Sequence, residues 1–324
     1  MQCSPARWQR WTLAAAALLS LACNRQQQRR IAVIPKGTAH VFWQSVHAGA
    51  VAAGREFHED ILWDGPPNET DYSRQLEILD SMLNRHVEGV VVAAADRTTL
   101  NASLDRAARE KIPVVVFDSS VDGDNFVSFV ATNNFLAGKL GARKLAELLH
   151  GKGTVAMIQN APGSASTMDR ERGFKEAMAQ EFPGIQIVAE QYGMSNRAKA
   201  MSAAENILTA HPRLDGLFAS SEPSSVGASQ AVKSRALQGK LKFVGFDSSD
   251  GLVEDLNAGV IDALVAQDPF KMGYEAVRVV TDKLNGKTPD KKVDLAAVVI
   301  TKADLEKPEI KALLHPDLEE YLGK

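Results

Sequence analysis

Residues 89–118 contain the unit that decides the fold: Gly89-Val-Val-Val-Ala93, a helical stretch over 98–111, and then Pro113-Val-Val-Val-Phe-Asp118. Short β-branched runs of this kind are typical of strands buried on both faces, and a helix between two of them forms the crossover of a parallel sheet. The same alternation continues from residue 29 onward. The sequence therefore predicts an α/β fold with mainly parallel sheets.

The alternation divides into two similar series. The first series has expected strands at 30–35, 60–63, 89–93 and 113–118, with helices near 43–57, 71–86 and 98–111. After 126–132, a second series has expected strands at 154–158, 185–189, 216–219 and 241–247, with helices near 134–150, 169–182, 197–211 and 224–236. A last strand, 262–268, and a helix, 270–286, leave 296–301 free to return to the other half. We expect two doubly wound parallel-sheet domains, as suits about 300 residues.

The first 22 residues have the pattern of a signal peptide. Arg7 and Arg10 precede the apolar run 11–22, which contains no acidic residue. This run is shorter than the ~20 residues of a membrane-spanning helix, and it ends on a small residue, Ala22, directly before Cys23. We expect cleavage between these two residues and export of the remainder to the periplasm or cell envelope.

Cys23 has two interpretations. Leu19-Ser-Leu-Ala-Cys23 resembles a bacterial lipobox, in which the cysteine is acylated, although Ser20 stands where Leu is usual. The alternative is ordinary cleavage, or a buried or incidental cysteine. Residues 23–29 are polar and suit a tether. We expect a lipid anchor at Cys23, and no disulfide or thiolate metal site, since the chain's only other cysteine lies in the leader.

Charge argues against a nucleic-acid partner. The chain has 37 basic and 40 acidic residues, and loss of Arg7 and Arg10 with the leader changes the net charge from −3 to −5. Nucleic-acid-binding domains are usually basic.

Polar residues follow several strands at the point where each strand ends. Asp118 ends a valine-rich run, Asp247 ends Phe243-Val-Gly-Phe, and Gln267 follows Leu264-Val-Ala. In open parallel sheets, ligands bind beyond the carboxyl ends of the strands. Each residue could instead cap a following helix, and Asp247-Ser-Ser-Asp250 is a fair capping signal. Both interpretations remain open from the residues alone.

The chain resembles the bacterial sugar-binding proteins of ABC importers related to ribose-binding protein, and the ligand-sensing domain of lactose-repressor-type regulators. The resemblance extends from about Ile31 to Ile300. It rests on the order and spacing of these short motifs: Phe42-Trp-Gln-Ser-Val-His-Ala-Gly49, Pro113-Val-Val-Val-Phe-Asp118, Ala131-Thr-Asn-Asn134, Arg170-Glu-Arg-Gly-Phe174, Leu208-Thr-Ala-His-Pro212, Val244-Gly-Phe-Asp247 and Ala266-Gln267. It implies a type I periplasmic binding fold, in which three segments near 132, 268 and 296 form a hinge that closes around a small polar ligand.

The resemblance also implies the binding residues. Phe42 and Trp43 would stack on the sugar ring, although both could be core residues at the start of a helix. Asp118, Arg170 and Asp247 would hydrogen-bond to sugar hydroxyls, with a surface arginine as the alternative for Arg170. The full expected set is His40, Phe42, Trp43, Asp118 and Ser119 from the first domain, Arg170, Ser195, Ser221, Glu222 and Asp247 from the second, and Gln267 at the crossover.

Four positions depart from the ribose-type pattern. His40 replaces Asn, Ser119 replaces the Arg after the aspartate, Ser195 stands near an expected aromatic residue, and Ser221-Glu222 replaces Asn-Asp. Loss of an arginine and an aromatic residue should widen the cleft and remove hydrogen-bond donors. We therefore expect a sugar other than ribose.

Other classes of protein fit less well. A glycosidase could use Asp118 and Asp247 as its carboxylate pair, but the chain lacks the common hydrolase, zinc-protease and phosphate-loop motifs. Its seven histidines are scattered, so we expect neither a metal nor a cofactor. A repressor would need a helix-turn-helix before Ile31. A binding protein that presents its ligand to a membrane sensor kinase or chemoreceptor remains the alternative to a partner of an importer permease.

The expected domains are discontinuous in sequence. We expect 30–132 plus 268–295 to form the N-terminal ligand-binding domain, and 133–267 plus 296–302 to form the C-terminal one. Residues 303–324 form a charged, helix-like tail that we expect to pack on the outside of a domain. The protein is expected to be a monomer.

Overall fold

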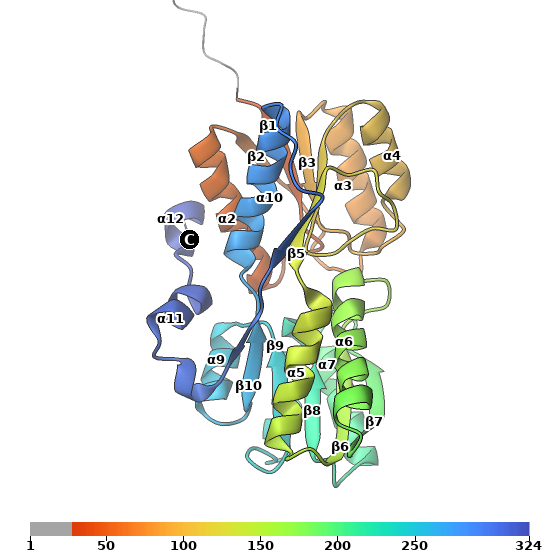
Figure 1. The fold of residues 1–324 in the computed structure, drawn as a ribbon, viewed down its shortest axis with the longest axis vertical. Helices are drawn as coiled ribbons and strands as arrows, with labels where there is room; N and C mark the ends of the chain where they lie inside the picture. The colour runs from red at the N-terminus through yellow and green to blue at the C-terminus, as the bar shows by residue number, and fades with distance from the viewer. Residues whose placement is uncertain (1–27, 324) are drawn as a thin grey trace, which may run out of the picture.

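The computed structural model describes residues 28–323. The predicted signal peptide 1–22, the lipidation site Cys23 and most of the tether lie outside the described residues. The described chain folds into two α/β halves, one above the other in Figure 1, each built on a six-stranded sheet. The predicted fold class is confirmed. No helix within 28–323 has both the length and the apolar character to cross a membrane.

The first half contains a fully parallel sheet in the order β11-β5-β4-β3-β1-β2. Its strands are β1 (Arg30–Ile34), β2 (Asp60–Trp63), β3 (Gly89–Val92), β4 (Val114–Phe117), β5 (Ser128–Thr132) and β11 (Lys292–Leu295). One face packs on α2 (Val41–Phe57) and α10 (Pro269–Leu284), and the other on α3 (Tyr72–Asn84) and α4 (Asn101–Arg109). Every residue of β3 and β4 is buried, as their unbroken apolar runs predict.

The second half repeats the plan in the order β12-β10-β9-β8-β6-β7. Its strands are β6 (Gly153–Gln159), β7 (Ile185–Tyr192), β8 (Gly216–Ala219), β9 (Lys242–Phe246), β10 (Ala263–Ala266) and β12 (Val298–Ile300), and β12 alone of these is antiparallel to its neighbour. One face packs on α5 (Asn134–Leu148) and α6 (Ala165–Glu181). The other packs on α7 (Arg197–Ala210), α8 (Glu222–Ser234) and α9 (Asp250–Asn257).

Three short segments connect the halves. The chain crosses at residue 133 between β5 and α5, at 267–268 between β10 and α10, and at 296–297 between β11 and β12. All three lie within a residue or two of the positions expected for the hinge. They join the carboxyl ends of strands, so the hinge and the predicted binding residues belong to the same region of the molecule.

Helices α5 and α6 approach each other so closely that two glycines are required. A Cβ atom on Gly138 would lie 1.9 Å from the backbone oxygen of Arg170, and a Cβ on Gly173 would lie 2.1 Å from that of Phe135. No side chain fits at either position. This contact fixes α6, and therefore Arg170, against the first residues after the hinge segment at 133.

The C-terminal tail contacts both halves, whereas we expected it to pack on one domain. It comprises a 3-10 turn, η2 (Lys302–Asp304), and two short helices, α11 (Pro308–Leu314) and α12 (Leu318–Leu322). Ile310 of α11 joins the apolar core of the second half. Helix α12 packs against α2 of the first half (Figure 1).

Candidate functional site

A small cavity lies between the two halves, at the carboxyl ends of both sheets. Its volume is about 30 Å³, which is room for about two water molecules. The walls come from both halves, with Lys36 and Trp43 on one side and Arg170 and Asp247 on the other. A larger ligand can therefore enter only if the halves move apart.

Nine of the eleven predicted binding residues line this cavity: His40, Phe42, Trp43, Asp118, Arg170, Ser221, Glu222, Asp247 and Gln267. Ser119 and Ser195 do not line it and instead make contacts between the halves. The backbone N–H of Ser166 donates to Ser119 Oγ at 3.1 Å. The hydroxyl of Ser195 donates to Glu69 Oε2 at 2.7 Å.

The Arg170 guanidinium is at the centre of the second half's contribution. Its side chain is 2% exposed, and its central carbon lies 3.4 Å from the ring centroid of Phe246. Nε and Nη2 donate to Asn134 Oδ1, at 3.3 and 2.8 Å, and Nη1 donates to the carbonyl of Ser220. Arg172, two residues later, has a side chain that is 61% exposed. The alternative of a surface arginine is therefore wrong for Arg170.

Asp247 binds neighbouring residues rather than capping the helix that follows it, α9. Its Oδ1 accepts from Gln267 Nε2 at 2.7 Å, and its Oδ2 accepts from the backbone N–H of Glu222 at 2.9 Å and lies 3.8 Å from Arg170 Nη1. The N-cap of α9 is Ser249, whose side chain makes no capping bond. Burial raises the pKa of Asp247, and Arg170 opposes the increase. Burial also lowers the pKa of Arg170, against the attraction of Asp247.

Asp118 is the counterpart of Asp247 in the first half. Both residues follow a strand in the left-handed region, with φ of 54° and 66°, a conformation that Asp tolerates better than most side chains. Lys36 Nζ lies 2.8 Å from Asp118 Oδ2, and both side chains are buried. Although Ser119 replaces the family's arginine, Lys36 supplies a cation at this aspartate. The Lys36–Asp118 pair of the first half thus corresponds to the Arg170–Asp247 pair of the second.

The two aromatic residues differ in exposure. Phe42 is partly buried, whereas Trp43 is 1% exposed and belongs to the core of the first half. Their rings meet edge to face at 4.9 Å between centroids. The indole N–H of Trp43 donates to Glu69 Oε1 at 2.8 Å. Trp43 is therefore both a core residue and part of the cavity wall.

Glu69 brings a further carboxylate to the cavity wall. Burial acts to raise the pKa of Glu69, but attraction to Lys36 and His40 and hydrogen bonds from Ser195 and Trp43 together outweigh burial and lower the pKa. Glu69 is therefore held in its charged form between the two halves.

Two acceptor atoms at the cavity lack a hydrogen-bond donor among the described residues. They are Glu222 Oε2 and Gln267 Oε1. Both residues are buried, at 1% and 4% exposure. The other oxygen of Glu222 accepts from Arg197, and His40 Nδ1 lies 3.4 Å from Oε2. Buried acceptors are normally satisfied, so this part of the cavity wall suits a ligand that donates hydrogen bonds.

The family comparison agrees with this architecture. Residues 31–288 match the family model described as the periplasmic binding protein domain. The chain belongs to the periplasmic binding protein family. Membership implies an exported, periplasmic location.

Similar proteins include several that are named for a sugar. The D-ribose/D-allose-binding protein of Pseudomonas aeruginosa is 29% identical over 89% of this chain and 92% of its own length. Two of the similar solved structures, both from Agrobacterium, contain a bound sugar. A carbohydrate transporter solute-binding protein of A. radiobacter, in complex with D-arabinose, is 31% identical with a TM-score of 0.87, over 90% of this chain and all of that one. An ABC transporter solute-binding protein of A. vitis, with bound D-fucose, is 32% identical with a TM-score of 0.85, over 88% of this chain and all of that one.

The cleft of this periplasmic binding protein includes residues that the sequence reasoning missed: Lys36, Glu69, Asn160, Ser166, Thr167 and Pro223. Lys36 and Asn160 follow strands β1 and β6, so the rule that selected Asp118 and Asp247 could have found them. Ser166 was missed because the helix was expected to begin at 169, whereas α6 begins at Ala165. Glu69 lies in a loop whose sequence carries no periodic signal.

Over residues 28–323, no group of three or more His, Cys, Asp or Glu side chains is arranged to hold a metal ion.

Proposed function

We propose that this periplasmic binding protein is the sugar-binding component of an ABC importer, and that it holds a monosaccharide between its two halves. The observation that carries the proposal is that two buried acceptors, Glu222 Oε2 and Gln267 Oε1, accept no hydrogen bond from the described residues, in a cavity that Arg170 also lines as a donor. A sugar presents adjacent hydroxyls, which both donate and accept hydrogen bonds. The D-arabinose and D-fucose complexes of similar proteins support the same ligand class.

We assign ligand contacts to the predicted residues that line the cavity, and add Lys36 and Glu69. Charged hydrogen bonds contribute about 1.5–3 kcal/mol each, and a micromolar ligand needs about 8 kcal/mol in total. A few such contacts from Asp118, Arg170 and Asp247 are enough. Phe42 offers a partly exposed ring for the apolar face of the sugar.

Ligand binding is proposed to close the cleft by rotation about the segments near 133, 268 and 296, between the domains 30–132 plus 268–295 and 133–267 plus 296–302. A ligand that contacts both halves favours the closed state by its difference in affinity for the two states. The small cavity supports this mechanism, since entry needs separation of the halves.

The protein is further proposed to release its sugar unchanged. The proteins that it resembles are named as binding proteins. Incubation with each sugar that it binds, followed by chromatography, should recover the sugar intact. Turnover of the sugar would refute this part of the proposal.

We also propose that the mature chain is a monomer anchored through acylated Cys23. The support is the lipobox-like Leu19-Ser-Leu-Ala-Cys23 after a signal-like leader. Metabolic labelling with a radioactive fatty acid should label the wild-type protein and leave Cys23→Ala unlabelled. Light scattering of the purified protein tests the monomer.

The experiment that tests the main proposal is mass spectrometry of whatever small molecule co-purifies, followed by thermal-shift assays with pentoses, hexoses and polyols. We expect a sugar in the first and stabilisation by the same sugar in the second. An amino acid or a peptide as the bound molecule would contradict the proposal.

A further inference from the structure

Residues 301–323 connect the two halves outside the three hinge segments, and we refer to them as the strap. The strap leaves β12 in the second half, forms α11 there, and then passes to α2 of the first half (Figure 1). It therefore connects the halves by packing, in addition to the three hinge segments and the hydrogen bonds across the cleft.

The anchor of the strap on the second half is apolar. Ile310 is 7% exposed and belongs to the same core cluster as Ile300 of β12. Leu305, Leu313 and Leu314 pack against that cluster. Burial of these apolar side chains stabilises the contact, so α11 moves with the second half.

The anchor on the first half is polar and aromatic. Arg55 at the end of α2 donates to the carbonyl oxygens of Glu320 and Tyr321, at 3.0 and 3.3 Å. Its guanidinium carbon also lies 5.3 Å from the Tyr321 ring centroid. The Tyr321 ring also lies 5.4 Å from that of Phe270 at the start of α10, measured between ring centroids. Helix α12 therefore moves with α2 and α10.

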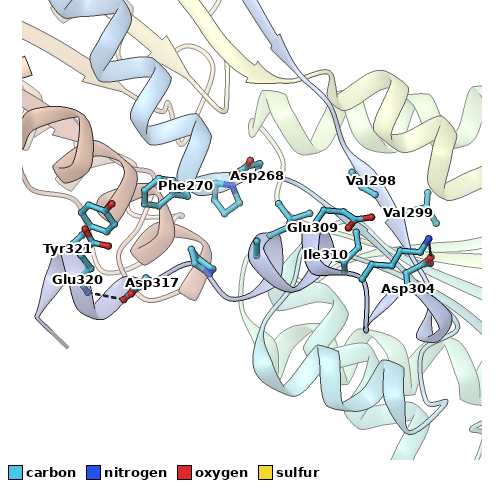
Figure 2. A pocket seen from close by; sticks show the side chains of 15 residues that line it. Asp268, Phe270, Val298, Val299, Asp304, Glu309, Ile310, Asp317, Glu320 and Tyr321 are labelled. Atoms are coloured by element: carbon cyan, nitrogen blue, oxygen red, sulfur yellow. Dashed lines mark hydrogen bonds and ion pairs between the residues drawn. The ribbon is translucent and has the colours of Figure 1, made fainter. Parts of the chain in front are cut away.

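Between the anchors, the strap bridges a hollow. A cavity of about 760 Å³ separates it from the hinge segments, with Asp268, Val298 and Val299 on the hinge side (Figure 2). This cavity lies between the middle of the strap and these residues near the hinge. The effect of the strap on motion must come from its two ends.

The strap also borders the binding cleft. Leu313, Leu314 and Pro316 line a small cavity together with Phe42 and Gln267, which are proposed ligand contacts. Helix α2 begins beside the cleft with Phe42 and is held by the strap near its other end. Movement of α2 relative to the second half therefore affects the cleft and the strap together.

We propose that the strap limits how far the two halves separate, and thereby slows release of the ligand. Three residues, 315–317, join α11 to α12. A fully extended chain spans about 3.5 Å per residue, so this linker reaches about 10 Å before an anchor must detach. The limit on opening follows from the length of the linker alone, whereas the effect of the strap on ligand release rests on the proposed function.

The test measures the distance between the halves directly. Spin labels at Ala102→Cys on α4 and Ala179→Cys on α6, both exposed positions, are placed in the full chain with Cys3→Ser and Cys23→Ser. Pulsed electron paramagnetic resonance then gives the distribution of distances. A release variant, Arg55→Ala with Tyr321→Ala, removes the anchor of the strap on the first half.

A second variant and a control keep the test decisive. Insertion of Gly-Ser-Gly-Ser after Pro316 lengthens the linker and keeps both anchors, so it tests the limit even if the release variant folds poorly. The control Arg74→Ala removes an exposed ion pair with Glu77 within the first half. We expect both strap variants to extend the distribution to longer distances without sugar, and the control to match the parent protein.

Ligand release is the second measurement. With D-allose or D-arabinose as the probe, stopped-flow dissociation should be about tenfold faster in both strap variants than in the parent. An unchanged upper limit of distance in both variants would overturn the proposal, whichever sugar binds. If neither sugar binds the parent, the proposed function is in doubt, and the distance measurement still decides the role of the strap.

Discussion

Replacement of Arg170 by alanine tests the binding site most sharply. A guanidinium has five N–H donors, and three of those of Arg170 are used by Asn134 and Ser220. Two remain for a ligand. One charged hydrogen bond contributes about 1.5–3 kcal/mol, so loss of a single ligand bond should raise the Kd about 10- to 150-fold.

The same substitution also affects stability. It leaves the buried Asp247 without its cation and removes the contact with Phe246. Breaking a buried charge pair costs about 3–5 kcal/mol, so thermal unfolding should move to a clearly lower temperature. Arg170→Lys restores the charge without the fork of donors. It should recover part of the stability and little of the affinity.

Titration calorimetry with D-arabinose and D-allose is the assay. The control is Arg172→Ala on the same helix, whose ion pair with Asp169 is exposed on both sides. It should bind like the wild type. If Arg170→Ala stays folded and binds within twofold of the wild-type Kd, the placement of the ligand against Arg170 is refuted.

Three further predictions concern the framework of the site. Burial raises the pKa of Glu171 above its unfolded value, so this carboxyl group binds a proton more readily in the folded protein than in the unfolded chain. The stability that comes from this proton is lost as the pH rises from about 4.5 through the raised pKa. Glu171→Gln should flatten the fall in unfolding free energy over that range, and an equal slope in both proteins would contradict the prediction. Gly138→Ala should lower the unfolding free energy by at least the ~1–3 kcal/mol of an overpacked core, because the new methyl group would meet the backbone oxygen of Arg170. The control is Gly251→Ala, where a Cβ would have no atom within 4 Å, and it should change the unfolding free energy by less than about 1 kcal/mol. Denaturant unfolding of both variants checks this prediction. Asn134→Ala should weaken sugar binding several-fold by freeing the guanidinium of Arg170, and calorimetry showing unchanged affinity would mean that Asn134 does not position it.

Most of the fold could be predicted from local patterns. Valine-rich strands such as β3 and β4 are buried on both faces, and this produces runs that alternate visibly with helices. β11 was not predicted as a strand, because Lys292-Val-Asp-Leu295 is an exposed edge strand with mixed polarity. The contacts of the tail with α2 depend on residues more than 260 positions apart, such as Arg55 and Glu320. No periodicity in the sequence records such a pair.

The site residues that could be predicted are those that directly follow a strand, because the direction of the strand fixes the edge of the sheet at which they lie. Asp118 follows a strand of the first sheet, and Asp247 and Gln267 follow strands of the second. Such residues lie at the carboxyl edge of their own sheet, where ligands bind. Glu69 and Ser166 reach the cavity because the two halves face each other. Their contacts with Ser195 and Lys36 cross between halves that are far apart in sequence. Local sequence reasoning has no access to that relationship.

The measurement that tests the central proposal most directly is titration calorimetry of the wild-type protein with D-allose, D-arabinose, D-fucose and D-ribose. We predict saturable one-site binding of at least one of these sugars, with a Kd near the micromolar range. For D-ribose we predict a Kd above the submicromolar range. Submicromolar binding of D-ribose would contradict the specificity inferred from His40, Ser119, Ser195 and Glu222. The absence of saturable binding with all four sugars would contradict the assignment of this cleft to a monosaccharide.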